Sequence, residues 1–224
     1  PKTMLEHCVS MSLISSKAAT RSLCVGAGRG KRVGMERRNP CRALSHLGRR
    51  ELVLELLDAV SNTERGLNCS AGKLIEIEEL VTDLTSLQTG QPTTGNDLSA
   101  TWKLLWTTEK ETLFILDKAP LFGTKAGDVY QVIDVRRGLL QNVITFPPDG
   151  AFIVTASTEP VGPQRMEFKF TGAKLKLPAW DVPVPPFGQG WFDTVYLDDQ
   201  IRVARDIRGD TLVVARDGLP REFS

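Results

Sequence analysis

The hydrophobic positions of this chain change their period near residue 90. Over Arg49–Val60, apolar side chains recur every three or four residues, which predicts a helix with one packing face. A second helix is predicted to begin after Ser70, a favourable N-cap residue. Between them lies Gly66, which can adopt the left-handed conformation that ends a helix. These segments predict an α-helical hairpin over residues 48–90.

Beyond the loop at Gly90–Asp97, apolar and polar residues alternate with the period of β-strands. The expected strands are Thr101–Thr107, Glu111–Leu116, Val129–Val135, Leu139–Phe146, Ala151–Ser157, Met166–Phe170, Ala173–Leu177, Phe192–Leu197, Ile201–Ala204 and Thr211–Ala215. All gaps but one are too short for a crossover helix, so the pairing should be antiparallel. We therefore expect a mainly β fold, in which residues 91–224 form an antiparallel β-barrel behind the helical hairpin.

The one long gap is the proline-rich segment Pro178–Gly190. Its four prolines cannot donate hydrogen bonds to a strand ladder, so the segment is predicted to be an extended loop over the barrel rim. A proline-rich ligand for a partner protein is the alternative.

Charge divides the chain into two parts. Residues 1–50 hold 11 Lys/Arg and two acidic residues, whereas residues 51–224 hold 17 Lys/Arg and 25 acidic residues. The basic, Ser-rich segment 1–47 is typical of an organelle transit peptide. A basic disordered tail that binds nucleic acid or anionic lipid is the alternative. The acidic remainder, one folded domain over 48–224, has little electrostatic reason to bind nucleic acid.

The distribution of histidine and cysteine excludes several chemistries. Both histidines, His7 and His46, precede the predicted domain, and Cys69 is the single cysteine within it. A domain without histidine cannot use Ser-His-Asp or Cys-His catalysis or a histidine-based metal site. We therefore predict no catalytic residue, no metal and no cofactor, and no segment approaches the ~20 apolar residues of a membrane helix.

Aromatic residues of the first strand suggest an apolar pocket. Trp102, Leu104 and Trp106 alternate along one strand, so they are expected on one inward face. A ligand cavity or a solidly packed core would both use them. The remaining pocket candidates are Tyr130, Val132 and Phe146.

Two amides in the next hairpin, Gln131 and Asn142, are embedded among apolar neighbours together with Tyr130. Buried polar groups need hydrogen-bond partners. Cross-strand or backbone hydrogen bonds are expected to satisfy them, and the head group of a ligand is the alternative.

The C-terminal block from Trp191 to Asp210 is rich in Asp and Arg. We interpret Asp198, Arg202 and Arg205 as members of a salt-bridged structural hairpin that closes the barrel, with Arg202 buried and paired. An Asp pair that works as acid and base, or that holds Ca²⁺ or Mg²⁺, is the alternative.

Four segments, taken in order, resemble the plastid-lipid-associated protein family, also called fibrillins. They are TERGL at 63–67, ATWKLLWTT at 100–108, GDVYQVID followed by LLQNVITF at 127–146, and YLDDQIRVAR with RGDTLVVARD at 196–217. The resemblance implies a lipocalin-like barrel in the chloroplast, at plastoglobules or thylakoids or in the stroma. It also implies binding of apolar metabolites such as prenylquinones, carotenoids or fatty acids, without catalytic residues.

Two other functions are compatible with the residues. The protein could be a structural coat of plastid lipid droplets with a filled barrel, or an Asp-dependent enzyme acting on a lipid or sugar. The enzyme hypothesis requires an interior Asp pair such as Asp193 and Asp198. Contact with a lipid surface would use the apolar loops Ala119–Phe122 and Pro185–Phe187.

Overall fold

The computed structural model describes residues 48–122, 124–177, 181–185 and 188–224. The expected leader, 1–47, lies outside the described residues, as do parts of the proline-rich segment.

Both predicted helices are present. Helix α2 spans Arg49–Ser61 and helix α3 spans Ala71–Gln88, and the two pack against each other. Ser70 is the N-cap of α3, where its hydroxyl accepts a hydrogen bond from the Lys73 amide at 3.2 Å. The sequence predicted both helices because their apolar residues recur with helical spacing and because Ser70 is a favourable N-cap.

The turn between the helices, η1 (Glu64–Gly66), requires glycine at its last position. Gly66 has φ of 108°, and a Cβ there would lie 2.2 Å from the carbonyl oxygen of Thr107. The Arg65 guanidinium reaches the Gly127 carbonyl from the same turn. The TERGL segment thus joins the helix pair to the end of the first strand and needs the missing side chain to do so.

Nine strands follow. They are β1 (Ala100–Thr107), β2 (Val129–Asp134), β3 (Leu139–Phe146), β4 (Gly150–Pro160), β5 (Arg165–Lys176), β6 (Asp181–Val184), β7 (Gln189–Leu197), β8 (Ile201–Asp206) and β9 (Thr211–Arg216). Neighbours pair antiparallel in the order β4-β3-β2-β1-β9-β8-β7-β5-β6. An additional pairing of β4 with β5 closes this sheet into a ring. The mainly β, antiparallel prediction is confirmed.

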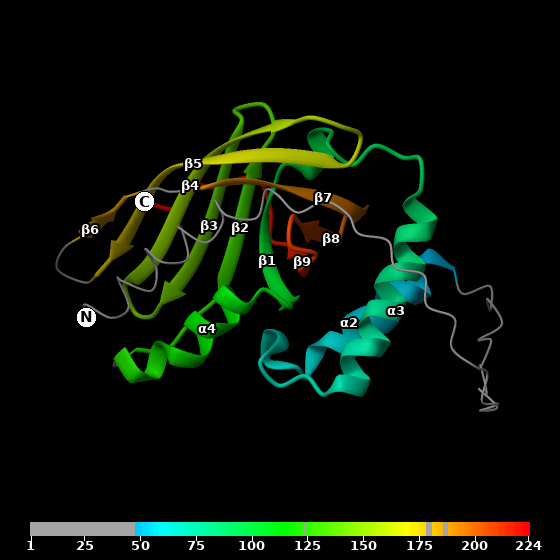
Figure 1. Ribbon diagram of the computed structural model, residues 1–224, viewed down its shortest axis with the longest axis horizontal. Coiled ribbons are helices and arrows are strands. Elements are labelled where there is room, and N and C mark those ends of the chain that lie inside the picture. Colours follow the sequence, from blue (N-terminus) through cyan, green and yellow to red (C-terminus); the bar gives the residue numbers. More distant parts are fainter. Residues whose placement is uncertain (1–47, 123, 178–180, 186–187) are drawn as a thin grey trace, which may run out of the picture.

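One predicted strand is wrong. The segment predicted as a strand over Glu111–Leu116 is helix α4 (Lys110–Lys118), which lies below the strand ends, apart from the helix pair (Figure 1). Its apolar run is too short to separate strand from helix by periodicity. The helix buries Ile115, Leu116 and the following Ala119 against β3, β4 and β6, and this i, i+1, i+4 spacing belongs to a helix face.

Two further predictions about the strands are wrong. The turn expected at Thr171–Gly172 is an irregularity inside the single strand β5, because Thr155 pairs with Gly172 while Ala156 pairs with Phe170. Glycine in a strand interior often marks such a bulge. The proline-rich segment contains the short edge strand β6, where Pro183 is tolerated because an edge strand leaves one side unpaired.

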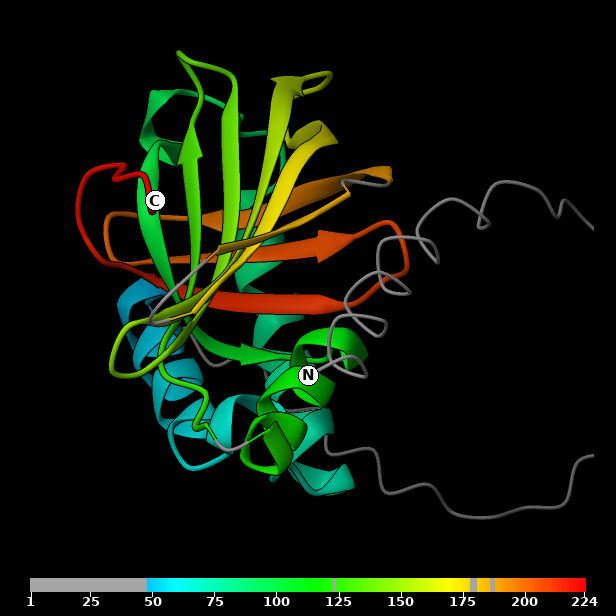
Figure 2. The same cartoon turned by 90° about the vertical axis from the view of Figure 1, so that its left-hand side faces the viewer.

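The two largest apolar clusters lie on opposite sides of β1. Helices α2 and α3 cover the outer face of β1, β7, β8 and β9, whereas the second core lies inside the ring (Figures 1 and 2). The outer core contains Leu56, Ile77, Leu84, Trp106, Val203 and Val213. The inner core contains Trp102, Leu104, Ile133, Leu140, Phe192 and Val214.

Candidate ligand cavity

The interior of the ring is not completely filled. A cavity of about 230 Å³ lies between the inner faces of the strands and α4. Its apolar wall comes chiefly from Leu104, Ile115, Ile144, Phe152, Phe168, Phe170, Val184, Phe192 and Val214. Small-ligand sites usually enclose ~300–1,000 Å³. The cavity is therefore large enough for a ring or a length of chain, and too small to enclose a long isoprenoid completely.

The three candidate pocket residues of β1 do not all lie at the cavity. Leu104 lines the cavity, and the fully buried Trp102 lies beside it in the inner core, where its indole nitrogen donates to the Leu98 carbonyl at 3.0 Å. Trp106 lies in the outer core beneath the helices. The expectation of one shared face is wrong, because the pairing of β1 with β9 shifts between Leu104 and Trp106. This bulge reverses the alternation after Leu104.

The other three candidates also lie in different places. Tyr130 borders the cavity, although its ring stacks on Phe223 with centroids 5.3 Å apart. Val132 is fully buried beside Tyr130 on β2, but it does not border the cavity. Phe146 packs in the cluster under α4, next to the cavity rather than on its wall.

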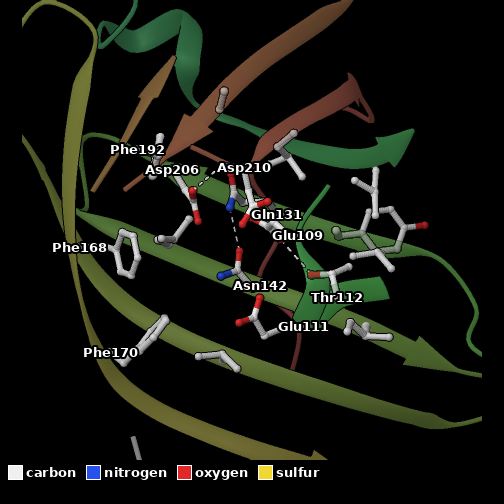
Figure 3. Close-up of a pocket in the computed structure, with 18 of the residues that line it drawn as sticks. Glu109, Glu111, Thr112, Gln131, Asn142, Phe168, Phe170, Phe192, Asp206 and Asp210 are labelled. Atoms are coloured by element: carbon white, nitrogen blue, oxygen red, sulfur yellow. Dashed lines mark hydrogen bonds between the residues drawn. The ribbon is translucent and has the colours of Figure 1, made fainter. Parts of the chain in front are cut away.

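A line of polar side chains crosses the inner face of the ring. Gln131 donates to the Asn142 side-chain oxygen at 2.8 Å, which confirms the cross-strand hydrogen bond predicted for these amides (Figure 3). The Gln131 oxygen accepts from Arg202 Nη1 at 2.6 Å, and Arg202 Nε donates to Thr194 at 3.2 Å. Strands β2, β3, β7 and β8 are thus connected from inside.

Arg202 is buried, as predicted, but its pairing differs from the expectation. Its exposed fraction is 0%, and its guanidinium also lies 4.9 Å from the centroid of the Phe192 ring. Within the described residues its hydrogen-bond partners are neutral, and its Nη2 has none. Burial lowers the pKa of Arg202 to about 9, and the charge of Glu109 opposes this shift. The sequence could not show that this side chain lines the interior of the ring.

Glu109 is the site residue that the sequence did not reveal. It is the N-cap of α4, lines the cavity and accepts a hydrogen bond from Thr112 at 2.9 Å (Figure 3). Burial raises the pKa of the Glu109 carboxyl to about 7, and the nearby negative charge of Asp206 adds to the shift. A single Glu forms no sequence motif. Glu109 could have been noticed only if the segment after it had been predicted as a helix, with Glu109 at its N-cap.

Acidic residues surround one arginine at the same end of the cavity. Arg208 pairs with Glu111 and Asp206, at 3.2 Å for the latter, and lies 3.7 Å from Asp210. Figure 3 shows Asp206 and Asp210 near Glu109, with Glu111 below Asn142. Across residues 48–224, apart from those whose placement is not described, no three His, Cys, Asp or Glu side chains form a metal-binding group. The cluster is therefore an ion-pair network at the cavity mouth.

The residues proposed for the structural hairpin lie outside the cavity, except Arg202. The Asp198 carboxylate accepts from Tyr196, at 2.7 Å, and from the amides of the β8 turn. Arg205 pairs with Glu78 of α3 at 2.9 Å, which links the strands to the helices. Asp193 pairs with Arg165 at 2.7 Å. The interior pair of Asp193 and Asp198 that the enzyme hypothesis requires is thus not formed.

Comparison with known proteins identifies the family. The sequence profile of PAP_fibrillin matches residues 50–215, which cover every helix and strand that the structure describes except the first residue of α2 and the last residue of β9. This chain belongs to the PAP_fibrillin family. The matched residues include the strands of the ring and the polar side chains that line its cavity, so these features lie within the segment that the family profile describes.

Relatives in this family carry plastid names. Probable plastid-lipid-associated protein 11, chloroplastic, from Arabidopsis thaliana is 52% identical over 164 residues, which cover 72% of this chain and 77% of the relative. Plastid-lipid-associated protein, chloroplastic, from Citrus unshiu is 25% identical and covers 74% of this chain and 67% of the relative. Light-induced protein, chloroplastic, from Solanum demissum is 24% identical over the same shares. These relatives place the chain among chloroplast proteins.

No solved structure matches the chain. Among the helices that the structure describes, none is both long and apolar enough to cross a membrane.

Proposed function

We propose that this chain is a plastid lipid-associated protein whose ring is a lipocalin-like barrel that holds an apolar metabolite. The observation that carries the proposal is the mostly apolar cavity inside the ring of a PAP_fibrillin protein. Each methylene group removed from water contributes about 0.8 kcal/mol. About ten buried methylenes would give on the order of 8 kcal/mol. This gain offsets a large part of the entropic cost of association, which is about 4–15 kcal/mol.

The candidate ligands are prenylquinones, carotenoids and fatty acids, at plastoglobules or thylakoids. A cavity of about 230 Å³ favours a ligand that is held by one end, with the rest of its chain outside. In this proposal, residues 1–47 are a transit peptide and residues 48–224 form one folded domain. The exposed Leu121 in η3 (Ala119–Phe122) supports contact with a lipid surface through that loop. Pro186 and Phe187 of the second candidate loop lie outside the described residues.

The test is the lipid that the purified chain retains. The protein is incubated with plastid extract, recovered and analysed by mass spectrometry for prenyl and acyl lipids. The matched variant is Ala204→Leu, because Ala204 is buried and lines the cavity, so a larger side chain there occupies ligand space. We expect the wild type to retain lipid and the variant to lose most of it.

A structural coat protein is the second candidate function, and the small size of the cavity favours it. Trp102 of β1, Ile133 of β2 and Ala204 of β8 belong to one packed cluster, the inner core. Failure of the wild-type chain to retain any lipid would support the coat function and contradict the binding function.

A further inference from the structure

Arg202 places a positive charge inside the ring, where the charge of Glu109 acts on it but no ion pair with a described residue is formed. The side chain is fully buried and lines the cavity, and its Nη2 has no acceptor among the residues that the structure describes. Its neighbours Gln131 and Thr194 accept two of its hydrogen bonds but carry no charge. Removing a charge from water is costly unless an opposite charge and hydrogen bonds replace the solvent. The arrangement is therefore incomplete without a further acceptor.

Arg202 lines the cavity, so its unpaired Nη2 belongs to a side chain of the cavity wall. Arg202 Nη1 donates to Gln131 of β2 and Arg202 Nε donates to Thr194 of β7, so two of the three guanidinium nitrogens are fixed by hydrogen bonds. An arginine fixed in this way presents its remaining donor in one direction, which suits a carboxylate oxygen. A neutral hydrocarbon would leave this donor unsatisfied.

The surroundings select against strongly charged head groups. Glu109 lines the cavity, and Glu111, Asp206 and Asp210 line it at the same end. A phosphate or diphosphate would bring two or more negative charges toward these carboxylates and would find a single unpaired cationic donor. One negative charge, as on a carboxylate, matches the one available positive charge.

An apolar wall extends from this position toward α4. It consists of Ile115, Ile144, Phe152 and Val184, which belong to one core cluster and all border the cavity. Phe168 and Phe170, whose ring centroids are 5.2 Å apart, form the adjoining side on β5 (Figure 3). A chain attached to a carboxylate at Arg202 would lie against these side chains.

We propose that the cavity binds a long-chain carboxylate, with its head group on Arg202 Nη2 and its chain along the wall under α4. This inference rests on the proposed function and narrows it from apolar metabolites in general to fatty-acid-like anions. Gln131 and Thr194 are positioning residues, because they fix Nη1 and Nε of the guanidinium and leave Nη2 free to bind the ligand.

Binding of the carboxylate should depend on whether Glu109 is protonated. The charged groups that act on it are Arg202 and Asp206 of β8 and Arg208 and Asp210 of the turn that follows β8. A ligand carboxylate at Arg202 adds a negative charge nearby, so binding favours the protonated form of Glu109. The carboxyl of Glu109, with its pKa raised to about 7, then takes up a proton when the ligand binds above neutral pH.

The first experiment compares oleate with oleyl alcohol, which has the same chain and no charge. Equilibrium binding of each is measured to the full 224-residue chain at pH 6.5, for wild type and Arg202→Met. We expect wild type to bind oleate at least about tenfold more tightly than the alcohol, and Arg202→Met to lose that preference while its affinity for the alcohol changes less than about threefold.

The outcomes separate the two proposals. If neither ligand binds the wild type, the proposed function fails. If both bind wild type with equal affinity, the carboxylate inference is wrong and the proposed function stands. The wild-type comparison decides this even if Arg202→Met does not fold.

The second experiment follows oleate binding from pH 6 to pH 8. Wild type should lose about tenfold in affinity over this range, because Glu109 must be protonated beside the ligand. Glu109→Gln, which keeps an acceptor for Thr112 but does not titrate, should change less than about threefold. A wild-type affinity that stays constant, or an equal loss in the variant, would overturn the role of Glu109.

Discussion

The outer face of the ring beneath α2 and α3 and the inner face around Arg202 are both buried, but different side chains fill them. The outer core is formed by aliphatic residues together with Trp106 and Tyr196, and its ion pair, Glu78 with Arg205, lies partly exposed at the rim. The inner face combines apolar walls with the charges of Arg202 and Glu109 and an unfilled volume. The first arrangement gives stability through close packing.

The inner arrangement is poor for stability and good for recognition. A cavity forfeits contacts that a filled core would make, and a buried charge without an ion pair adds a desolvation cost. A protein retains such features where a ligand supplies the missing contacts. Under the proposed function, the outer face of these strands supports the structure and the inner face binds the ligand, so substitutions on each face should have different effects.

The largest difference is expected from leucine truncation on the two faces. Leu84 of α3 has an exposed fraction of 0% and lies in the outer core, so Leu84→Ala should lower the free energy of unfolding by about 3–5 kcal/mol. Leu104 already borders empty space, so Leu104→Ala should cost about 2 kcal/mol or less, below the usual range for a filled site. Urea denaturation measures both, and equal losses would mean that the faces are equally packed.

A second difference should appear in the dependence of stability on pH. Glu109 binds its proton more tightly in the folded state, where its pKa is raised from 4.5 to about 7. Between these values the folded protein holds more protons than the unfolded chain, so its stability must fall as pH rises. The fall is at most about 3 kcal/mol and ends above pH 7.

Glu109→Gln isolates this contribution. Unfolding free energies of wild type and variant, measured at pH 5 and pH 8, should diverge, with the variant gaining relative to wild type at the higher pH. Substitution of the exposed Glu159 by Gln provides the matched control and should show no such gain. A constant difference between wild type and Glu109→Gln would contradict the burial of an ionisable Glu109.

Alanine enlargement gives the smallest expected effects and the sharpest contrast in sign. Ala59 of α2, with an exposed fraction of 3%, is packed in the outer core, so Ala59→Leu should cost about 1–3 kcal/mol. Ala204, with an exposed fraction of 2%, borders the cavity, where Leu has room, and Ala204→Leu should change stability by less than about 1 kcal/mol. Thermal unfolding distinguishes them, and a large loss in Ala204→Leu would show that the cavity does not accept side chains.

Sequence patterns predicted the parts of this fold that depend on local signals. Helices α2 and α3, most strands and the Gln131–Asn142 pair follow from periodicity, capping and hairpin register. The burial of Arg202 was also predicted, although its hydrogen-bond partners differ from the expected salt bridge. The resemblance to the family, on four ordered segments, agreed with the comparison over residues 50–215.

The features that the sequence did not reveal depend on tertiary context. The bulge between Leu104 and Trp106 moves Trp106 to the outer core, and no residue type marks it. The run in α4 reads as strand or helix until the surface that it covers is known. Glu109 gains its importance from the burial that α4 and β8 impose. The cavity could therefore be expected in outline, but its charged residues could not be assigned.

Closure of the sheet has a consequence beyond the shape of the interior. With β4 joined to β5, the described strands leave unpaired ladder positions mainly along the short β6, where Pro183 interrupts the donors. Free edges invite strand addition between copies, especially where a protein is crowded. Displacing β6 would uncover the backbone of β5 at residues 173–176 and turn a self-contained molecule into a template for intermolecular pairing.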